Sequence, residues 1–260
     1  MGSLAGKSPK DTYKSLLKVT DETNGVTSSV SVIQDGNGSD TCLSVSERSL
    51  KINPSTNNIT TFEVENASGS NLLTVDTSNS SVKVGSSQTP TNTQILDFHA
   101  RNLVPASAGT HYFVGKGLSP YFGTSPELAN GTGTDPATTF DGGDATDDLL
   151  QNLFLVPVNS TIDAVKFMVS TITDTDCVIN VHLYSFDMTN AGGTDDGNLT
   201  NGTLLAYGRA TSVDRNVIKT VTCTIDSANV TANKVIACFV ENETNTDAIF
   251  LQTQVLYHFD

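Results

Sequence analysis

Short runs of alternating apolar and polar residues recur along the chain, and this period of two predicts β-strands. The stretch TFEVENASGSNLLTVDTSNSSVKVG, residues 61–85, contains three such runs, and the residues between them are mostly Ser, Asn, Gly and Thr. Each run places only two apolar side chains on one face. Strands this poor in apolar residues bury too little surface to form a core of their own.

Residues 29–52 read as another copy of this unit and align with residues 61–84. The matched positions are Val30/Val32 with Phe62/Val64, Leu43/Val45 with Leu73/Val75, and Leu50/Ile52 with Val82/Val84. Such repetition is typical of arrays of small supersecondary units. Ordering one unit costs more conformational entropy than its few apolar side chains return on burial. We therefore expect each unit to stack on its neighbour, on other chains or on a large surface, and three chains around a shared axis would form a fibre shaft.

The C-terminal part has longer and more apolar strand candidates. After a strand at 111–115, they span residues 152–157, 162–170, 177–186, 203–210, 216–225, 234–241 and 248–259. Alternation places two apolar sets inward, namely Cys177, Ile179, Val181 and Leu183, and then Ile249, Leu251, Val255 and Tyr257. A similar inward set in NVIKTVTCTI comprises Val217, Val221, Cys223 and Ile225. Strands of this number and spacing predict an antiparallel β-sandwich of jelly-roll type.

The pattern divides the chain into four segments. Residues 1–20 form an N-terminal attachment segment, and residues 21–85 form the two β-repeat units of the shaft. Residues 86–110 form a connector that prolines interrupt, and residues 111–260 form the β-sandwich head with a long polar loop at 117–150. The predicted fold class is all-β, with an N-terminal anchor, a thin trimeric β-repeat shaft and a C-terminal sandwich.

Charge is unevenly distributed along the 260 residues, whose formal net charge is −14. Residues 1–18 carry four lysines and one acid, and a short helix after Pro9 would place their apolar side chains on one face. We expect this segment to dock on an acidic partner, with a solvated tail as the alternative. The docking residues are Lys7, Lys10, Tyr13, Lys14, Leu16, Leu17 and Lys18.

The rest of the chain is acidic, which argues against binding to nucleic acid. No apolar run reaches the length of a membrane span, so we expect no membrane insertion. The first 18 residues also lack the apolar core of a secretion signal.

The four cysteines are Cys42, Cys177, Cys223 and Cys238, and none forms a CxxC pair. We expect free, buried thiols in a protein that is assembled in a reducing cytoplasm. A disulfide among the last three stays open, whereas zinc is disfavoured without closely paired ligands.

Residues with catalytic or metal-binding chemistry are few. The histidines His99, His111, His182 and His258 are scattered, and neither HExxH nor GxSxG occurs. His182 is expected to be exposed on the polar face of its strand, and we predict that the protein is not an enzyme and has no cofactor. The acidic loop offers weak calcium candidates, although a solvated loop is favoured because the EF-hand spacing is absent. These candidates are Asp141, Asp144, Asp147 and Asp148.

Three segments carry a resemblance to a known family, namely SPKDTYKSLLKVTDETNGV, DGNGSDTCLSVSERSLKINP and FEVENASGSNLLTVDTSNSSVKVG. They resemble the N-terminal half of fibre-like structural proteins of tailed bacteriophages, especially marine ones. VPASAGTHYFVGKGLSPYFG and the later strands resemble the β-sandwich tips of such proteins. The resemblance implies a homotrimer with an attachment segment, a β-rich shaft and a head, and it transfers no catalytic residue. Head fibre, capsid decoration protein and tail fibre all stay open.

These features predict a structural component of a phage virion that is made in the host cytoplasm and displayed on the virion surface. Its expected partners are further copies of itself, other virion proteins of the capsid, portal–neck or tail, and a host-surface glycan. Candidate glycan contacts are Tyr112, Tyr121 and Phe122, for which ordinary packing is the alternative. The second hypothesis is a carbohydrate-binding adhesin module, and the third is a polysaccharide-degrading spike enzyme.

Overall fold

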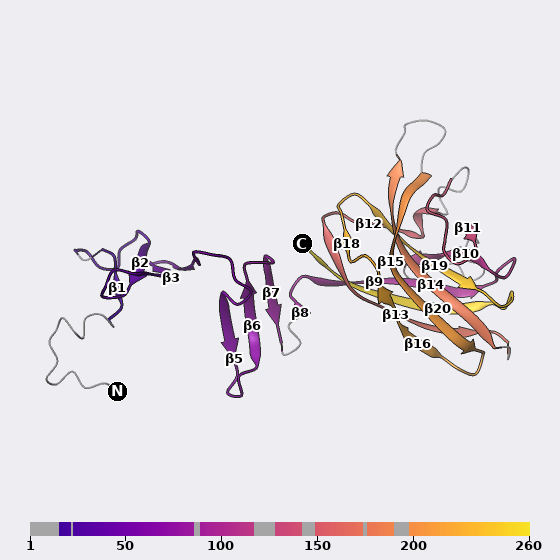
Figure 1. Cartoon of the computed structure of the whole chain (residues 1–260), viewed down its shortest axis with the longest axis horizontal. Helices are drawn as coiled ribbons and strands as arrows, with labels where there is room; N and C mark the ends of the chain where they lie inside the picture. Colours follow the sequence, from indigo (N-terminus) through magenta and orange to yellow (C-terminus); the bar gives the residue numbers. More distant parts are fainter. Residues whose placement is uncertain are drawn as a thin grey trace. The chain divides into compact units, whose positions relative to one another are not determined.

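The structure is a computed structural model that describes residues 16–21, 23–85, 89–116, 128–141, 149–173, 176–189 and 198–260. Its strands pair in antiparallel sheets, which confirms the all-β prediction (Figure 1). The chain divides into two compact units, Met1–Thr91 and Asn92–Asp260. Each unit is described by itself.

The first unit contains two small antiparallel sheets, each of which holds one sequence repeat. The first sheet comprises β1 (Lys18–Val19), β2 (Ser31–Gln34), β3 (Asp40–Val45) and β4 (Leu50–Ile52). The second comprises β5 (Phe62–Glu65), β6 (Asn71–Asp76), β7 (Ser81–Val84) and β8 (Thr89–Pro90). In both sheets the strands pair in chain order, so each repeat is a meander.

The first strand of the first repeat differs by one residue from the predicted alignment. Phe62 lies opposite Val75 in the second repeat, and Ser31 lies opposite Val45 in the first. Ser31 is therefore the structural counterpart of Phe62, and the predicted match with the two valines of this strand is wrong. The shift matters because moving a strand by one residue turns all its side chains to the other face.

The second unit has one large sheet with the strand order β16-β13-β20-β9-β10-β19-β14-β15-β17. Three short strands lie off this path, with β11 on β10, β12 on β19 and β18 on β13. The strands are β9 (Thr93–Leu103), β10 (Thr110–Lys116), β11 (Ala129–Thr132), β12 (Leu153–Leu155), β13 (Ser160–Thr171), β14 (Cys177–Thr189), β15 (Asn198–Val213), β16 (Lys219–Thr222), β17 (Thr224–Ile225), β18 (Asn229–Val230), β19 (Val235–Asn242) and β20 (Ile249–Phe259).

The two ends of this sheet come together in one short segment. Strand β16 pairs with β13 at one end, and β17 pairs with β15 at the other, yet only Cys223 separates β16 from β17 in the chain. The backbone N–H of Cys223 donates to the carbonyl of Val165 in β13. The sheet is therefore nearly closed into a barrel, and its strands surround the core.

The main core lies inside this barrel-like sheet. Both inward sets that alternation predicts around β14 and β20 are buried there, whereas Val217 of the third set is 36% exposed and is a wrong prediction. The three cysteines of this unit are buried free thiols, as expected, whereas Cys42 of the first unit is a free thiol that is exposed, so the expected burial is wrong there. Burial raises the pKa of Cys223 to about 12, so this thiol stays protonated.

The structure does not support the prediction that residues 86–110 form only a connector. Strand β9 takes up 11 of these 25 residues and pairs along its length with β20, while Leu96, Phe98 and Leu103 enter the core. Strand β9 also joins the two halves of the sheet, because Gly115 and Lys116 of β10 pair with it. The head therefore begins at Asn92 rather than at residue 111.

A second apolar cluster covers the opposite face of β10, β19 and β14. Phe113, Tyr184 and Phe239 project from these strands, and Leu149 and Leu153 pack onto them from the segment before β13. This half of the sheet is thus covered on both its inner and its outer face. Polar side chains on the outer face, next to the second apolar cluster, can therefore also be buried.

Candidate functional site

A polar pocket of about 520 Å³ lies on the outward face of β10, β19, β14 and β15, beside the second apolar cluster. Its lining residues are Gly109, Gly133, Thr134, Asn180, Tyr207, Arg209, Glu241 and Glu243. Alternation explains the polarity of this face. Ile179 and Val181 point into the main core, so Asn180 between them points outward.

Cross-strand register assembles the site in two rows that run across four strands. The first row is His111, Glu241, Asn180 and Arg209, and the second row is Phe113, Phe239, His182 and Tyr207. Residues that are far apart in the chain therefore become direct neighbours on one face.

Asn180 is the centre of the hydrogen-bond network. Its Nδ2 donates to Glu241 Oε2 at 2.7 Å and to Glu243 Oε2 at 3.2 Å. The hydroxyl of Tyr207 donates to Asn180 Oδ1 at 3.0 Å. The guanidinium of Arg209 donates to both carboxylate oxygens of Glu243, at 3.1 and 2.9 Å. These bonds fix the orientation of the side chains that line the pocket.

A tight loop closes one side of the pocket. Asn130 exchanges two hydrogen bonds with Ala137, both at 2.9 Å. Gly131 has φ +91°, and a Cβ there would lie 3.1 Å from the backbone nitrogen of Ala137, so this position requires glycine. The loop places the carbonyl of Gly133 3.0 Å from His111 Nε2, which donates to it.

Two histidines are buried beside the pocket. The rings of His111 and His182 meet edge to face with centroids 5.0 Å apart, and neither side chain is exposed. His182 also lies against Tyr207, with ring centroids 4.8 Å apart. Within the described part of the chain, His111 Nδ1 and both ring nitrogens of His182 lack a hydrogen bond of good geometry, although the backbone of Thr134 lies close enough to His182 to oppose the lowering of its pKa. The closest acidic atom to His182 Nε2 among the ion pairs is Asp135 Oδ1, at 3.6 Å.

Burial keeps both rings neutral. Burial and, after it, the neighbouring His111 lower the pKa of His182 to about 3. Burial also lowers the pKa of His111, although Glu241 opposes this effect. The sequence-based expectation that His182 is exposed is wrong, because the loop and the second apolar cluster cover its face of the strand.

Local charge at the pocket is negative. Glu241 is only 3% exposed, and none of the described Lys and Arg residues forms an ion pair with it. Its nearest basic atom is His111 Nε2 at 4.0 Å, on a ring that is neutral. Arg209 is paired with Glu243, so the carboxylate of Glu241 has no Lys or Arg partner among the residues that the structure describes.

Tyr112 is not a glycan contact and instead follows the predicted alternative, ordinary packing. It is 2% exposed, belongs to the main core, and accepts a hydrogen bond from the backbone N–H of Ala106 through its hydroxyl. It therefore presents no surface to a sugar. Tyr121 and Phe122 lie outside the described residues.

The predicted docking and calcium residues are only partly within the described chain. Lys7, Lys10, Tyr13 and Lys14 lie outside it, as do Asp144, Asp147 and Asp148. Leu16 and Leu17 are exposed and precede the first strand without being helical, and Lys18 begins β1. Asp141 is exposed. Across the described ranges, no group of three or more His, Cys, Asp or Glu side chains is arranged to hold a metal ion.

Sequence reasoning missed every residue of the pocket. Asn180 and Glu241 are polar residues within strongly apolar strands, and Glu243 follows directly after β19, which is the local signal that was available. That local pattern does not determine which strands are neighbours in the sheet, so the sequence could not predict that these residues lie close together.

Comparison with known proteins gives no relative. No known protein family matches the chain, and no curated protein matches it.

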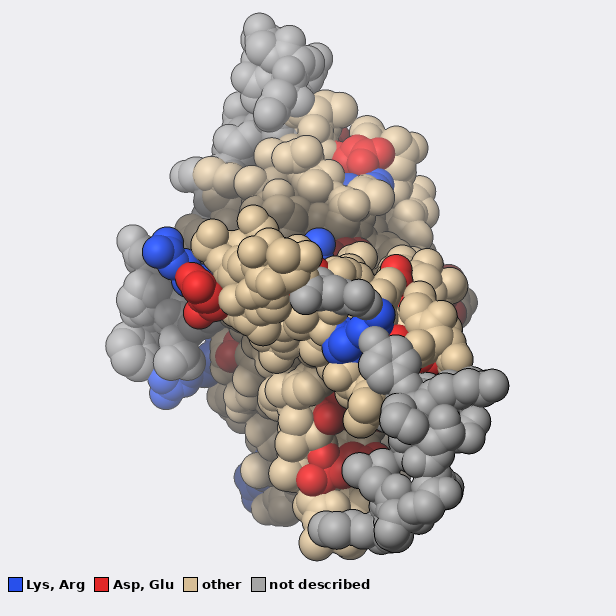
Figure 2. Space-filling model, turned by 90° about the vertical axis from the view of Figure 1, so that its left-hand side faces the viewer, with Lys and Arg blue, Asp and Glu red and all other residues tan. Residues whose placement is uncertain are grey.

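Among the described residues there is no helix with the length and apolar character needed to cross a membrane. Charged side chains are scattered among a larger number of uncharged residues on the side of the molecule drawn in Figure 2.

Proposed function

We propose that the protein is a fibre-like structural component of a tailed-phage virion that works as a homotrimer. In this proposal the N-terminal segment attaches to the capsid, the portal–neck or the tail. The repeats form the trimeric shaft, and the second unit is the head, a sandwich of jelly-roll type that projects from the virion surface. The protein is a building block rather than an enzyme.

The observation that carries this proposal is an open apolar face on the second repeat. Six apolar side chains form two rows across three strands, namely Phe62, Val75 and Val82, and Val64, Leu73 and Val84. The four on the outer strands β5 and β7 are 37–43% exposed in the single chain. The first repeat presents a smaller set of the same kind, with Leu43 opposite Ile52 and Val45 opposite Leu50.

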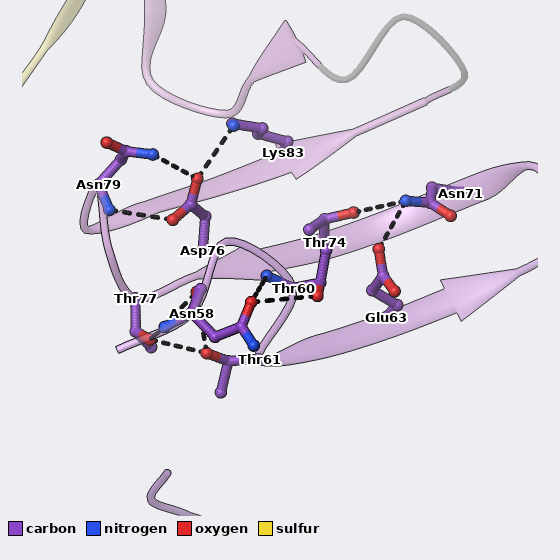
Figure 3. Close-up of polar contacts among 10 residues, drawn as sticks. All are labelled: Asn58, Thr60, Thr61, Glu63, Asn71, Thr74, Asp76, Thr77, Asn79 and Lys83. Carbon is purple, nitrogen blue, oxygen red and sulfur yellow. Dashed lines mark hydrogen bonds and ion pairs between the residues drawn. The ribbon is translucent and has the colours of Figure 1, made fainter. Parts of the chain in front are cut away.

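The opposite face of the second repeat is mostly polar, and most of its polar side chains are hydrogen-bonded (Figure 3). Asn71 donates to Glu63 and to Thr74, and Asp76 accepts hydrogen bonds from Asn79 and Lys83. The bonds from Asn79 and then Lys83 lower the pKa of Asp76 to about 2. This face therefore carries mostly paired polar groups, whereas the other face leaves a contiguous set of apolar side chains exposed.

Other copies of the same chain are the partners that fit the apolar face. Contiguous exposed apolar surface marks interaction sites in soluble proteins. Burying the remaining exposed part of each of the six side chains would contribute roughly 0.5–1 kcal/mol. Three chains around a common axis would direct these faces toward one another and leave the polar faces in water, which is a closed symmetric arrangement.

Neighbouring residues of β6 provide a matched test of the trimer. Leu73 belongs to the apolar face, whereas Leu72 is 48% exposed and shares the strand side of Thr74. We expect sedimentation equilibrium at micromolar concentration to give a trimer for the wild type and for Leu72→Ser, and a smaller species for Leu73→Ser. A wild-type monomer, or equal behaviour of the two variants, would contradict the proposal.

Deleting residues 1–19 tests the attachment segment. We expect the truncated protein to keep its oligomeric state and its head but to lose incorporation into particles. Replacing only the four lysines should slow attachment and make it less sensitive to salt, because exposed charges are screened beyond about 8 Å at physiological salt. Wild-type occupancy of particles by the truncated protein would place the anchor elsewhere.

A carbohydrate-binding adhesin module is the second candidate function. The observation that favours it is the polar pocket, whose carboxylate, amide, guanidinium and phenol groups are held in fixed positions. The two functions are compatible, since a fibre head that contacts a host needs a binding site.

A further inference from the structure

We propose that the polar pocket of the head binds an amino sugar, and that the ammonium group of the sugar pairs with Glu241. The inference deepens the proposed function by naming a ligand for the head. It rests on that function only for the source of the sugar, a glycan on the host surface.

The unneutralised carboxylate of Glu241 is the first observation. A carboxylate that is 3% exposed loses most of its hydration, and this loss is costly unless a cation or several hydrogen bonds compensate. Asn180 supplies one hydrogen bond at 2.7 Å, and the neutral ring of His111 stays 4.0 Å away. An ammonium group in the pocket would supply the missing positive charge and up to three donors.

The surrounding charges favour a cation over an anion. Arg209 is held by Glu243, and Asp135 lies at the same side of the pocket, 3.6 Å from His182. With both histidines neutral, acidic groups outnumber the basic group. Such a field raises the local concentration of cations. A metal ion fits less well, because no set of three or more metal ligands is assembled among the described residues.

Spare hydrogen-bonding capacity favours a ligand with hydroxyl groups. Both ring nitrogens of His182 and Nδ1 of His111 are buried without a hydrogen bond of good geometry, and such groups in native proteins require an explanation. The two rings adjoin the lining residues Tyr207 and Gly133. Neither ring lines the pocket, so a ligand hydroxyl would reach a bare imidazole nitrogen through a bridging water, while it can bond a carboxylate of the lining directly. The volume of about 520 Å³ lies within the range of small-molecule sites.

Ligand-observed NMR titration of the full chain at low salt tests the proposal with four probes. Glucosamine is the expected ligand, and glucose and N-acetylglucosamine are matched controls that lack the ammonium group. The amide of Nα-acetyl-lysine carries an ammonium group without a sugar. We expect glucosamine to bind roughly tenfold or more tightly than each of the other three.

Two variants of opposite charge sharpen the test. Glu241→Gln should weaken glucosamine binding roughly tenfold or more. Arg209→Gln removes a positive charge from the pocket lining and should tighten glucosamine binding. Glu65→Gln, an exposed position in β5, is the matched control and should have no effect. Thermal melts of each variant check that the head is folded.

Several results would overturn the proposal. These are no glucosamine binding, equal binding of glucose or N-acetylglucosamine, stronger binding of the lysine amide, or wild-type affinity in Glu241→Gln. Equal loss in Glu241→Gln and Arg209→Gln would indicate general damage to the pocket and would also overturn it. Sedimentation of the same samples keeps the two proposals apart, because a trimer that binds no sugar contradicts only this one.

Discussion

The two units of the chain bury opposite kinds of side chain. In the described residues of the first unit, all four buried side chains are polar, namely Ser31, Ser44, Thr74 and Asp76. In the second unit, two apolar clusters fill the interior of the sheet and cover one of its outer faces. Both units are built from strands with the same alternation of apolar and polar residues, so the alternation alone does not decide which face is covered.

Strand length explains the difference. Strands of the head reach 12 to 16 residues, and the sheet is long enough to curl until its ends meet at Cys223. The apolar face of the head is therefore covered by the other half of the same sheet. Strands β5 to β7 have only four to six residues and cannot fold over themselves. Their apolar face is left exposed in the single chain, and the proposed trimer would cover it.

The largest expected effect comes from making the same substitution in both units. Phe239 is fully buried in the head, and Phe62 is 37% exposed on the open face of the repeat. Phe239→Ala should lower the free energy of unfolding of the head by about 3–5 kcal/mol, because it leaves a cavity. Phe62→Ala should leave head stability within about 0.5 kcal/mol and weaken only self-association. Urea unfolding and sedimentation of both variants measure this, and equal losses of head stability would break the comparison.

A smaller effect concerns the response of the head to acid. An unfolded histidine takes up a proton below about pH 6.5, whereas burial lowers the pKa of His182 to about 3 and also lowers that of His111. The unfolded state then binds more protons, so head stability should fall as the pH decreases from 6.5 toward 3. The slope is up to about 1.4 kcal/mol per pH unit for each ring.

His182→Phe should remove about half of this slope and keep the aromatic packing against Tyr207. His99→Phe is the matched control, because His99 lies on the side of β9 that faces away from the core. Urea unfolding at pH 7.5 and 5.0 gives the slopes. If His182→Phe retained the full slope, the two histidines would not be the acid-sensitive groups.

The smallest expected effect lies on the polar face of the repeat. Hydrogen bonds from Asn79, and then the contact with Lys83, lower the pKa of Asp76 to about 2. Its contribution to stability is therefore present above the unfolded pKa near 3.9 and is lost as the pH falls toward 2. Asp76→Asn should remove this acid dependence without changing the oligomeric state at neutral pH. Hydrogen exchange of residues 71–84 between pH 5 and 3 can measure it, with Glu65→Gln as the control, and a change of oligomeric state in Asp76→Asn would contradict it.

Much of the fold follows from the local pattern of the sequence. The alternation of apolar and polar residues within each strand was enough to predict the strands from 152 to 259 and the two repeats. Strand β9 was missed because Pro90 and Pro105 flank it and polar residues separate its apolar ones. The one-residue slip in β2 arose because Val30 and Val32 are both apolar, while pairing with β3 places Ser31 on the apolar side.

The candidate site could not be predicted in the same way. It depends on four strands that are distant in sequence, with His111 on β10 beside Glu241 on β19 and Asn180 on β14. The order of these strands is a tertiary property. Tyr112 shows the same limit, because the sequence left it either a glycan contact or a packed residue, and only the structure places it in the core.

Hydrogen–deuterium exchange of the full chain at two protein concentrations tests the central claim most directly. The apolar face of the repeats is proposed to depend on other chains, whereas the head has a core of its own. Protection of residues 62–84 should therefore increase with concentration as the trimer forms, and protection of β13, β14 and β20 should stay constant. Strong protection of residues 62–84 that persists unchanged in a dilute, monomeric sample would contradict the account.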